Sequence, residues 1–180
     1  MTPEHAVLMA SYNRWMNAKV YAAAARLDAA ALRAERAAFF GSVLGTMNHL
    51  VVGDRIWLAR FATHPGAHAA LDPVREMPLP RALDAILYDD LDALAQHRVL
   101  LDEVICRWAE ALSDRDLAQV LRYANTKGVV STRRFASLLM HFFNHQTHHR
   151  GQLTTLLSQA GQDVGVTDLL ALIANEDGGP

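Results

Sequence analysis

The stretch HFFNHQTHHRGQL, residues 141–153, decides how this sequence folds, and it holds four of the nine histidines of the chain. It continues a helical pattern of apolar residues that runs from about Leu138 to Leu156. At about 100° of rotation per residue, His145 and His149 fall within about 20° of these two leucines, in the middle of the apolar face. The other two histidines of the stretch fall at its edge. One histidine pair is therefore predicted to point into the core.

Two imidazoles four residues apart on a helix can share a metal ion. Their Cβ atoms lie about 5–6 Å apart, so one nitrogen of each ring can reach a single ion at roughly 2.0–2.1 Å. The alternative is a pair of core histidines satisfied by hydrogen bonds, because charging both buried rings would be costly. The spacing favours the metal for His145 and His149. For His141 and His148 it favours a supporting role at the edge of the site.

Two histidines alone make a weak metal site, so a third ligand is expected from another helix. The candidates are three further histidines and one carboxylate: His49, His97, His5 and Asp54. Periodicity leaves the choice open, because His49 lies off the centre of the strongest apolar stripe of its own helix. His64 and His68 lie in a proline-rich segment and are predicted to be solvated.

Four long helices are predicted along the chain. The first begins at Thr2-Pro3-Glu4, which supplies an N-cap, a proline at the first helical position and an acid in the first turn. This first helix is predicted to end near Leu27. The second and third cover residues 42–61 and 81–112. The fourth runs from Ser131 or Thr132 to about Ala160, and Gly161 ends it. Residues 63–80, with four prolines, are predicted to form a long loop.

Two smaller features complete the predicted fold. Residues 125–128, Asn-Thr-Lys-Gly, lie between residues that favour strands, which indicates a short hairpin-like insertion before the last long helix. Thr167 or Asp168 is predicted to begin a short C-terminal helix. Together these elements predict an all-α protein, a four-helix bundle that forms one domain over residues 1–180.

Composition excludes several classes of protein. The chain is 51% hydrophobic and 20% charged, as in ordinary globular proteins. The net charge of −2, with dispersed arginines, gives no basic field for nucleic acid. The one cysteine excludes an intrachain disulfide and a cysteine metal cluster. No apolar run reaches the ~20 residues that span a bilayer, and no apolar signal segment opens the chain. A cytoplasmic protein with no nucleic-acid or membrane partner is expected.

Four segments, taken together, resemble the DinB family of damage-inducible-type proteins. They are TMNHLVVGDRIWLARF (46–61), YANTKG (123–128), HFFNHQTHHRGQLTTLLSQAG (141–161) and VTDLL (166–170). The resemblance covers nearly the whole chain in order. It implies an up-down-down-up four-helix bundle of the DinB/YfiT-like group of metalloenzymes, often dimeric, so a homodimer is expected. It also implies a three-histidine site for a divalent metal ion, with His49, His145 and His149 as ligands.

The resemblance also bounds the function. Most DinB-like proteins have no assigned reaction, but relatives in the wider group are transferases or isomerases that use mycothiol, bacillithiol or glutathione. Three imidazoles leave a coordination position open and suit Zn, Ni, Fe(II) or Co. The expected function is a metal-dependent transferase or hydrolase that joins a low-molecular-weight thiol, or water, to a small-molecule substrate. A metal-binding stress-response protein without catalysis and a metal-free interaction protein are the alternatives.

Residues around the predicted ligands have expected roles of their own. The candidates for orienting the ligating rings are polar neighbours on the same helix: Asn144, His148 and Gln152. Gly151 lies in mid-helix, where it costs ~1 kcal/mol relative to Ala, and so predicts a close helix contact. Arg150 is predicted to pair with an acid such as Asp54. The apolar neighbours of Cys106 indicate a packed thiol and not a nucleophile.

Overall fold

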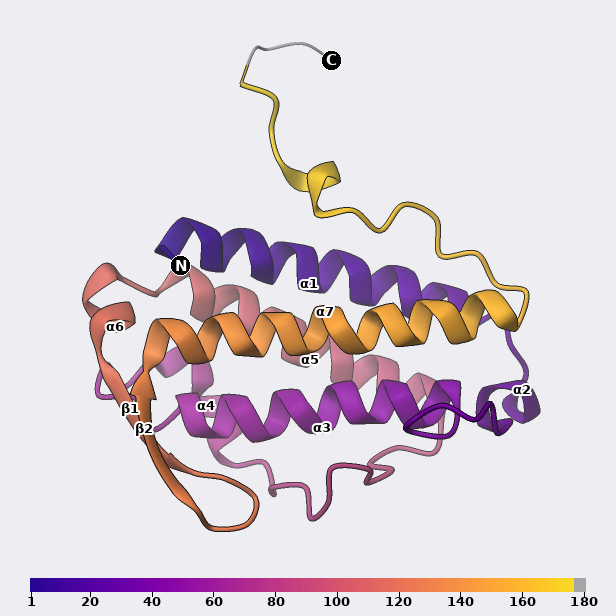
Figure 1. Cartoon of the computed structure of the whole chain (residues 1–180), viewed down its shortest axis with the longest axis horizontal. Coiled ribbons are helices and arrows are strands. Elements are labelled where there is room, and N and C mark those ends of the chain that lie inside the picture. Colours follow the sequence, from indigo (N-terminus) through magenta and orange to yellow (C-terminus); the bar gives the residue numbers. More distant parts are fainter. Residues whose placement is uncertain (177–180) are drawn as a thin grey trace.

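The computed structural model describes residues 1–176 and is mostly helical, with one small sheet. Four long helices in this part lie side by side along the long axis (Figure 1): α1 (Pro3–Ala24), α3 (Val43–Phe61), α5 (Leu91–Glu110) and α7 (Phe135–Gln159). Helix α1 packs on α5 and α7, while α3 packs on α7 and α5. The predicted domain also includes residues 177–180, which lie outside the described residues.

Side-chain caps fix where three of these helices begin. Thr2 accepts the backbone N–H of His5 at 3.3 Å, and the His5 ring bonds back to Thr2 in a capping box. Ser42 caps α3 through the N–H of Gly45 at 3.0 Å, so the helix predicted for residues 42–61 is confirmed. The predicted first helix is too long, because α1 ends at Ala24 and a separate short helix, α2 (Ala29–Arg33), follows it.

The prediction that the third helix begins at residue 81 was wrong. Helix α5 begins at Leu91, where Asp90 caps it through the N–H of Ala93 at 2.9 Å. The residues before it run as a loop along α3, because the Asn48 side chain accepts the N–H groups of Leu87 and Tyr88 at 2.8 and 3.0 Å. A loop in place of a helix therefore covers the outer side of α3.

The hairpin is confirmed, and it displaces the start of the last helix. Strands β1 (Val120–Ala124) and β2 (Val130–Arg134) pair antiparallel, with Val120 opposite Arg134. Ser131 and Thr132 were predicted to cap the last helix, but both lie in β2, and α7 begins only at Phe135. The all-α prediction is corrected to this extent by a two-stranded sheet.

Short turns of helix occupy the remaining connections. The loop predicted for residues 63–80 contains a 3-10 helix (Ala69–Leu71) and α4 (Asp72–Arg75), and α6 (Asp114–Ala118) precedes β1. The short C-terminal helix is a 3-10 turn, Leu169–Leu172. The segment that leads to it is attached to α1, because the Tyr12 hydroxyl donates to the Thr167 carbonyl at 2.7 Å.

Helix α3 is the most enclosed element of the core. Every residue from Val43 to Ile56 is buried, because α7 and α5 cover one side and the loop before α5 covers the other. Within residues 1–176, no helix combines the length and the apolar character that crossing a bilayer requires.

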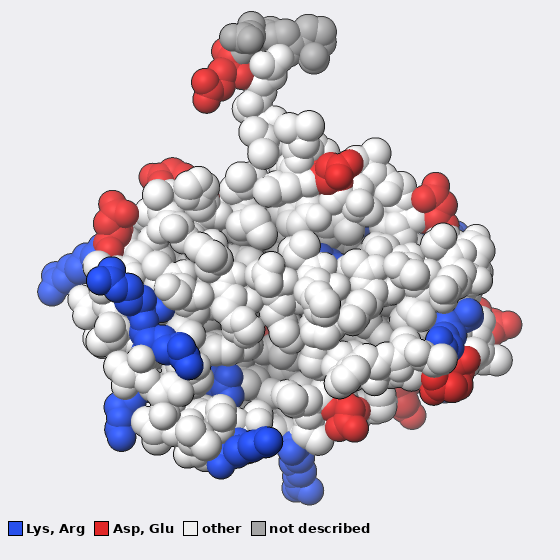
Figure 2. All heavy atoms as spheres, viewed as in Figure 1, with Lys and Arg blue, Asp and Glu red and all other residues white. Residues whose placement is uncertain are grey.

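Charge is not spread evenly over the surface. Figure 2 shows most Lys and Arg of this face toward the end where the hairpin lies, with a further basic group at the opposite end, and Asp and Glu scattered along the edges. Some arginines that are far apart in the sequence therefore lie at the same end of this face.

Candidate metal centre

Helices α3 and α7 bring together the three histidines that the family resemblance implied. One ring nitrogen from each of His49, His145 and His149 lies within 4.8 Å of the corresponding nitrogens of the other two. The ring centroids are 5.1 Å apart for His49 and His145, and 4.3 Å apart for His49 and His149. This arrangement places three neutral-imidazole donors around one volume at the α3–α7 contact.

The ring of His49 is held from two sides. Its Nδ1 lies 2.8 Å from the carbonyl oxygen of Leu83, so Nδ1 carries the proton and donates it. The Phe40 ring stacks on it with centroids 3.7 Å apart and planes tilted by 16°. The Nε2 atom is buried and has no hydrogen-bond partner. An orphaned buried acceptor is costly unless another group binds it, and a metal ion would satisfy it.

Gln152 orients His149 in the same manner. Its Oε1 accepts the proton of His149 Nδ1 at 2.8 Å, which leaves Nε2 of His149 unprotonated. The predicted role of Gln152 is therefore supported by its geometry. His148 is exposed and lies 3.3 Å from the Gln152 amide, so it belongs to the outer edge of this group. Asn144 is exposed, and no contact places it at the cluster.

His145 depends on a glycine that sequence reasoning missed. A Cβ added at Gly53 would lie 2.9 Å from Cε1 of His145, and the three atoms nearest to it all belong to that ring. Gly53 therefore makes the space in which the imidazole lies. Gly151, for which a close helix contact was predicted, meets nothing within 4 Å of an added Cβ, so that prediction was wrong. The signal for Gly53 is its position one turn after His49 on α3.

The environment keeps these imidazoles neutral. Burial lowers the pKa of His49 to about 4, against the opposing hydrogen bond to Leu83. Burial, followed by the nearby His149 and His49, lowers the pKa of His145 to about 3. Burial also lowers the pKa of His149, although the bond to Gln152 opposes it. Neutral rings are the form that binds a metal ion.

The predicted rotational position of α7 was wrong. Gln146 and Arg150 are 0% and 2% exposed and mark the centre of its buried face, whereas His145 and His149 are partly exposed. The pair lies at the side of the buried face, toward α3 and not toward the bundle axis. Polar side chains occupy the centre of this helical face, so counting apolar residues misplaced it by about one residue's rotation.

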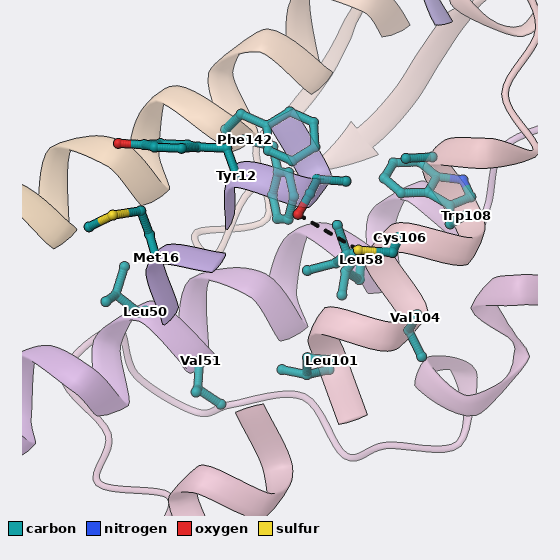
Figure 3. Packing of buried hydrophobic residues seen from close by; sticks show 14 of the residues in the cluster. Tyr12, Met16, Leu50, Val51, Leu58, Leu101, Val104, Cys106, Trp108 and Phe142 are labelled. Atoms are coloured by element: carbon teal, nitrogen blue, oxygen red, sulfur yellow. Dashed lines mark hydrogen bonds between the residues drawn. The ribbon is translucent and has the colours of Figure 1, made fainter. Parts of the chain in front are cut away.

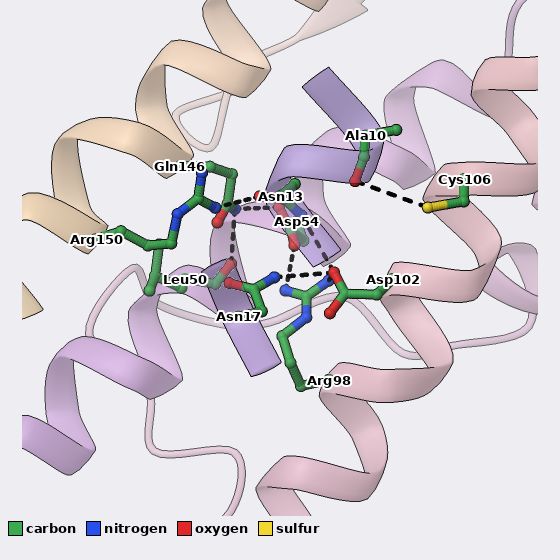
Figure 4. Close-up of polar contacts among 10 residues, drawn as sticks. All are labelled: Ala10, Asn13, Asn17, Leu50, Asp54, Arg98, Asp102, Cys106, Gln146 and Arg150. Atoms are coloured by element: carbon green, nitrogen blue, oxygen red, sulfur yellow. Dashed lines mark hydrogen bonds and ion pairs between the residues drawn. The ribbon is translucent and has the colours of Figure 1, made fainter. Parts of the chain in front are cut away.

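Those two residues belong to a buried polar network (Figure 4). The Asp54 carboxylate accepts hydrogen bonds from Gln146 and Arg98, so it pairs with Arg98 and not with Arg150 as predicted. Arg150 instead donates to Asn13. Burial raises the pKa of Asp54 to about 6, opposed by Arg98, so the carboxylate is ionised at neutral pH. These contacts take Asp54 out of the set of third ligands.

The remaining candidate ligands lie elsewhere. His5 is engaged in the cap of α1. His97 on α5 is half-buried beside Tyr88, with ring centroids 5.2 Å apart. His64 and His68 were predicted to be solvated, but His64 is 3% exposed and lies against Phe135, and the side chain of His68 is 7% exposed, so that prediction was wrong. Of the candidates, His49 is the one that the structure brings to His145 and His149.

The thiol of Cys106 is a packed core group (Figure 3). It is 8% exposed, and its Sγ lies 3.7 Å from the Ala10 carbonyl oxygen. Burial raises its pKa, which favours the unreactive thiol form.

Comparison with known proteins identifies the family of this chain. The family model described as DinB family matches residues 1–178. The chain belongs to the DinB family. It is also 25% identical over 159 residues to Protein DinB of Bacillus subtilis (strain 168), and this match covers 87% of each of the two chains. No solved structure gives a significant match. The resemblance of the four quoted segments to this family is therefore confirmed.

Proposed function

We propose that this DinB protein is a divalent-metal-dependent enzyme whose ion is held by His49, His145 and His149. The observation that carries the proposal is the buried Nε2 of His49, which has no hydrogen-bond partner. The Leu83 carbonyl occupies Nδ1 and leaves Nε2 free for an ion, and one nitrogen of this ring lies within 4.8 Å of one nitrogen of each of the other two imidazoles. Such a donor, left unpaired in the core, is expected where a metal ion completes the site.

Three neutral imidazoles fit Zn, Ni or Fe(II) and leave at least one coordination position open. When bound, such an ion lowers the pKa of a coordinated water or thiol and so supplies a nucleophile at neutral pH. We propose a thiol-dependent S-transferase, or a related transferase or hydrolase, acting on a small electrophile. Relatives of this group that use mycothiol, bacillithiol or glutathione support the thiol as co-substrate.

The protein's own residues orient the donors and provide a place for substrate. Gln152 and the Leu83 carbonyl fix two of the rings, and Phe40 covers His49. Beside Gln152 lies a pocket of about 290 Å³, whose wall also includes Arg36 and Thr46. This volume admits a small molecule. The proposed small-molecule substrate would bind there, with its reacting group toward the imidazoles.

We also propose the assembly that the family implies. Figure 1 shows α1 and α7 running in one direction and α3 and α5 running back, which supports an up-down-down-up four-helix bundle. A homodimer is proposed as well, on the ground of the family resemblance. Light scattering after gel filtration tests it: a monomeric mass throughout the micromolar range would contradict the dimer.

Metal content is the first test of the site. The protein is purified without a metal-affinity column, and its ions are counted by elemental analysis. His49→Ala and His145→Ala are each expected to lower the count by one ion per chain. His148→Ala is the matched control, because His148 is an exposed neighbour outside the ligand set, and it should leave the count unchanged. Equal counts in all four proteins would refute the site.

Turnover separates the enzyme from its alternative. The metal-loaded protein is incubated with a small electrophile and glutathione, bacillithiol or mycothiol in turn, and the loss of free thiol is followed. Turnover that His145→Ala abolishes and His148→Ala retains supports the enzyme. A bound ion without turnover on any thiol or in hydrolysis favours a metal-binding stress-response protein without catalysis.

A further inference from the structure

A second group of potential metal ligands lies beyond the C-terminal end of α3. It consists of His64 and His68, in the turn that follows the helix, and Asp116 of α6, which is far from them in sequence. One ligand atom from each lies within 4.8 Å of the others. Helix α6 and the end of α3 meet at the same end of the molecule in Figure 1. The fold therefore joins these residues by tertiary contact.

The three side chains converge on one side of Gly66. A Cβ built there would lie 2.8 Å from Oδ1 of Asp116, 2.9 Å from Nε2 of His68 and 3.0 Å from Nδ1 of His64. These are the three potential donor atoms, and glycine leaves the space between them open. Zinc binds such atoms at roughly 2.0–2.2 Å. The three atoms lie within 4.8 Å of one another, so one ion beside Gly66 could bind all three after small movements of the side chains.

One of these donors has no partner at present. The side chain of His68 is only 7% exposed, and its buried Nε2 atom has no hydrogen-bond partner. It lies 3.8 Å from Oδ1 of Asp116, which exceeds hydrogen-bonding distance. The other oxygen of that carboxylate accepts the hydroxyl and the N–H of Ser113 at 2.5 and 2.9 Å. Ser113 thus turns Oδ1 toward the histidine.

His64 is held in place by its neighbours. Its Nδ1 accepts the N–H of Gly66 at 2.9 Å, and its Nε2 lies 3.3 Å from the backbone oxygen of Asp116. With Nδ1 as acceptor, the proton lies on Nε2, which can donate to that oxygen. An ion at Nδ1 would replace the contact with Gly66 and keep the other hydrogen bond, as is usual for a metal-binding histidine.

The charges around the group favour a neutral His68. Burial lowers its pKa against the attraction of Asp116, and His64 and Arg75 lower it further. Arg75 is paired with Asp72 at 2.5 Å, so part of its charge is compensated. A neutral imidazole cannot form an ion pair with the carboxylate, but the two groups can bind one cation together.

We propose that His64, His68 and Asp116 form a second divalent-cation site, distinct from the three histidines between α3 and α7. Two imidazoles and one carboxylate suit Zn²⁺ or Fe(II). His64 and Asp116 also line a pocket of about 400 Å³, together with Gly66 and Ser113. The ion would tie the turn after α3 to α6 and so stabilise the folded chain.

The test uses the full chain with the first site removed by His145→Ala. This variant is stripped with chelator and titrated with Zn²⁺, with calorimetry for the count and thermal unfolding for the stabilisation. One ion per chain and a higher Tm are expected. Adding His68→Gln should abolish both, and Asp116→Asn, as a second substitution at the group, should do the same. Adding His97→Gln is the matched control, because His97 also has a buried unpaired Nε2 but belongs to no group of three potential ligands within residues 1–176.

Two results would overturn the proposal. One is a His145→Ala protein that binds no Zn²⁺ and keeps its Tm. The other is an ion that persists in both His68→Gln and Asp116→Asn. Circular dichroism of the metal-free variants shows that loss of the ion does not reflect loss of the fold.

Discussion

The substitution Gly53→Ala separates metal binding from folding, because it should stabilise the metal-free protein and weaken its affinity for metal. The new Cβ would lie 2.9 Å from Cε1 of His145, too close for the ring to stay where it is. Without metal, the end of this side chain can turn away. The gain in helix propensity then stabilises the protein by up to about 1 kcal/mol. With metal, the displaced ring binds less well, and disturbing the orientation of a ligand typically costs 10–100-fold in affinity.

That loss of affinity corresponds to about 1.4–2.8 kcal/mol, since each factor of ten is about 1.4 kcal/mol. In excess metal, the whole of it appears as lost stabilisation of the folded state. Gly53→Ala should therefore be as stable as the wild type or more stable in chelator, and less stable in excess Zn²⁺. Urea unfolding in both conditions measures the two differences, and a competition titration gives the affinity directly.

Gly151→Ala is the matched control for this prediction. It makes the same change on α7, close to His149, but its added Cβ meets nothing within 4 Å. It should gain the same helix propensity and keep the wild-type affinity for metal. Two outcomes would refute the reasoning: wild-type affinity in Gly53→Ala, or an equal loss of affinity in both variants.

Three further predictions follow from other contacts. Gln152→Leu removes the acceptor of His149 Nδ1 and should weaken metal binding by about 10–100-fold in the same competition titration. Arg98→Met leaves the buried Asp54 carboxylate without its cation and should cost about 3–5 kcal/mol in urea unfolding, whereas a loss under 1 kcal/mol would contradict this. Burial lowers the pKa of His97 to about 4, so the unfolded chain binds the proton first, and stability should fall as the pH drops from about 6.5 through 4. His97→Leu should weaken that pH dependence.

Sequence patterns predicted the start of a helix well where the capping residue and the apolar pattern agree. Ser42 and the residues that follow place α3 correctly, because the capping signal and the apolar pattern agree there. They failed at α5, whose predicted start was ten residues early. The residues before Leu91 have helical spacing, but Asn48 binds their backbone as a loop. A contact between segments distant in sequence decided this boundary, and local propensity cannot report it.

The burial of His49 illustrates the same limit. Its position off the apolar stripe of α3 gave no reason to bury it, if a helix is buried on one face only. The structure covers the second face with the loop that carries Leu83 and with Phe40. His49 therefore lies between its helix and that cover, and the carbonyl of the loop sets the direction of its ring. The family resemblance supplied this ligand where periodicity could not.

The polar network explains how the three imidazoles can meet at all. Gln146 donates to the Leu50 carbonyl at 3.2 Å and to Asp54, so it joins α7 to α3 beside the histidines. Gln146 follows His145 directly, and Leu50 follows His49. A shift of one helix along the other would break these bonds and leave buried polar groups unpaired, at about 1–3 kcal/mol each. The contacts that fix the register of α3 against α7 therefore also fix the separation of the proposed ligands, one residue away on each helix.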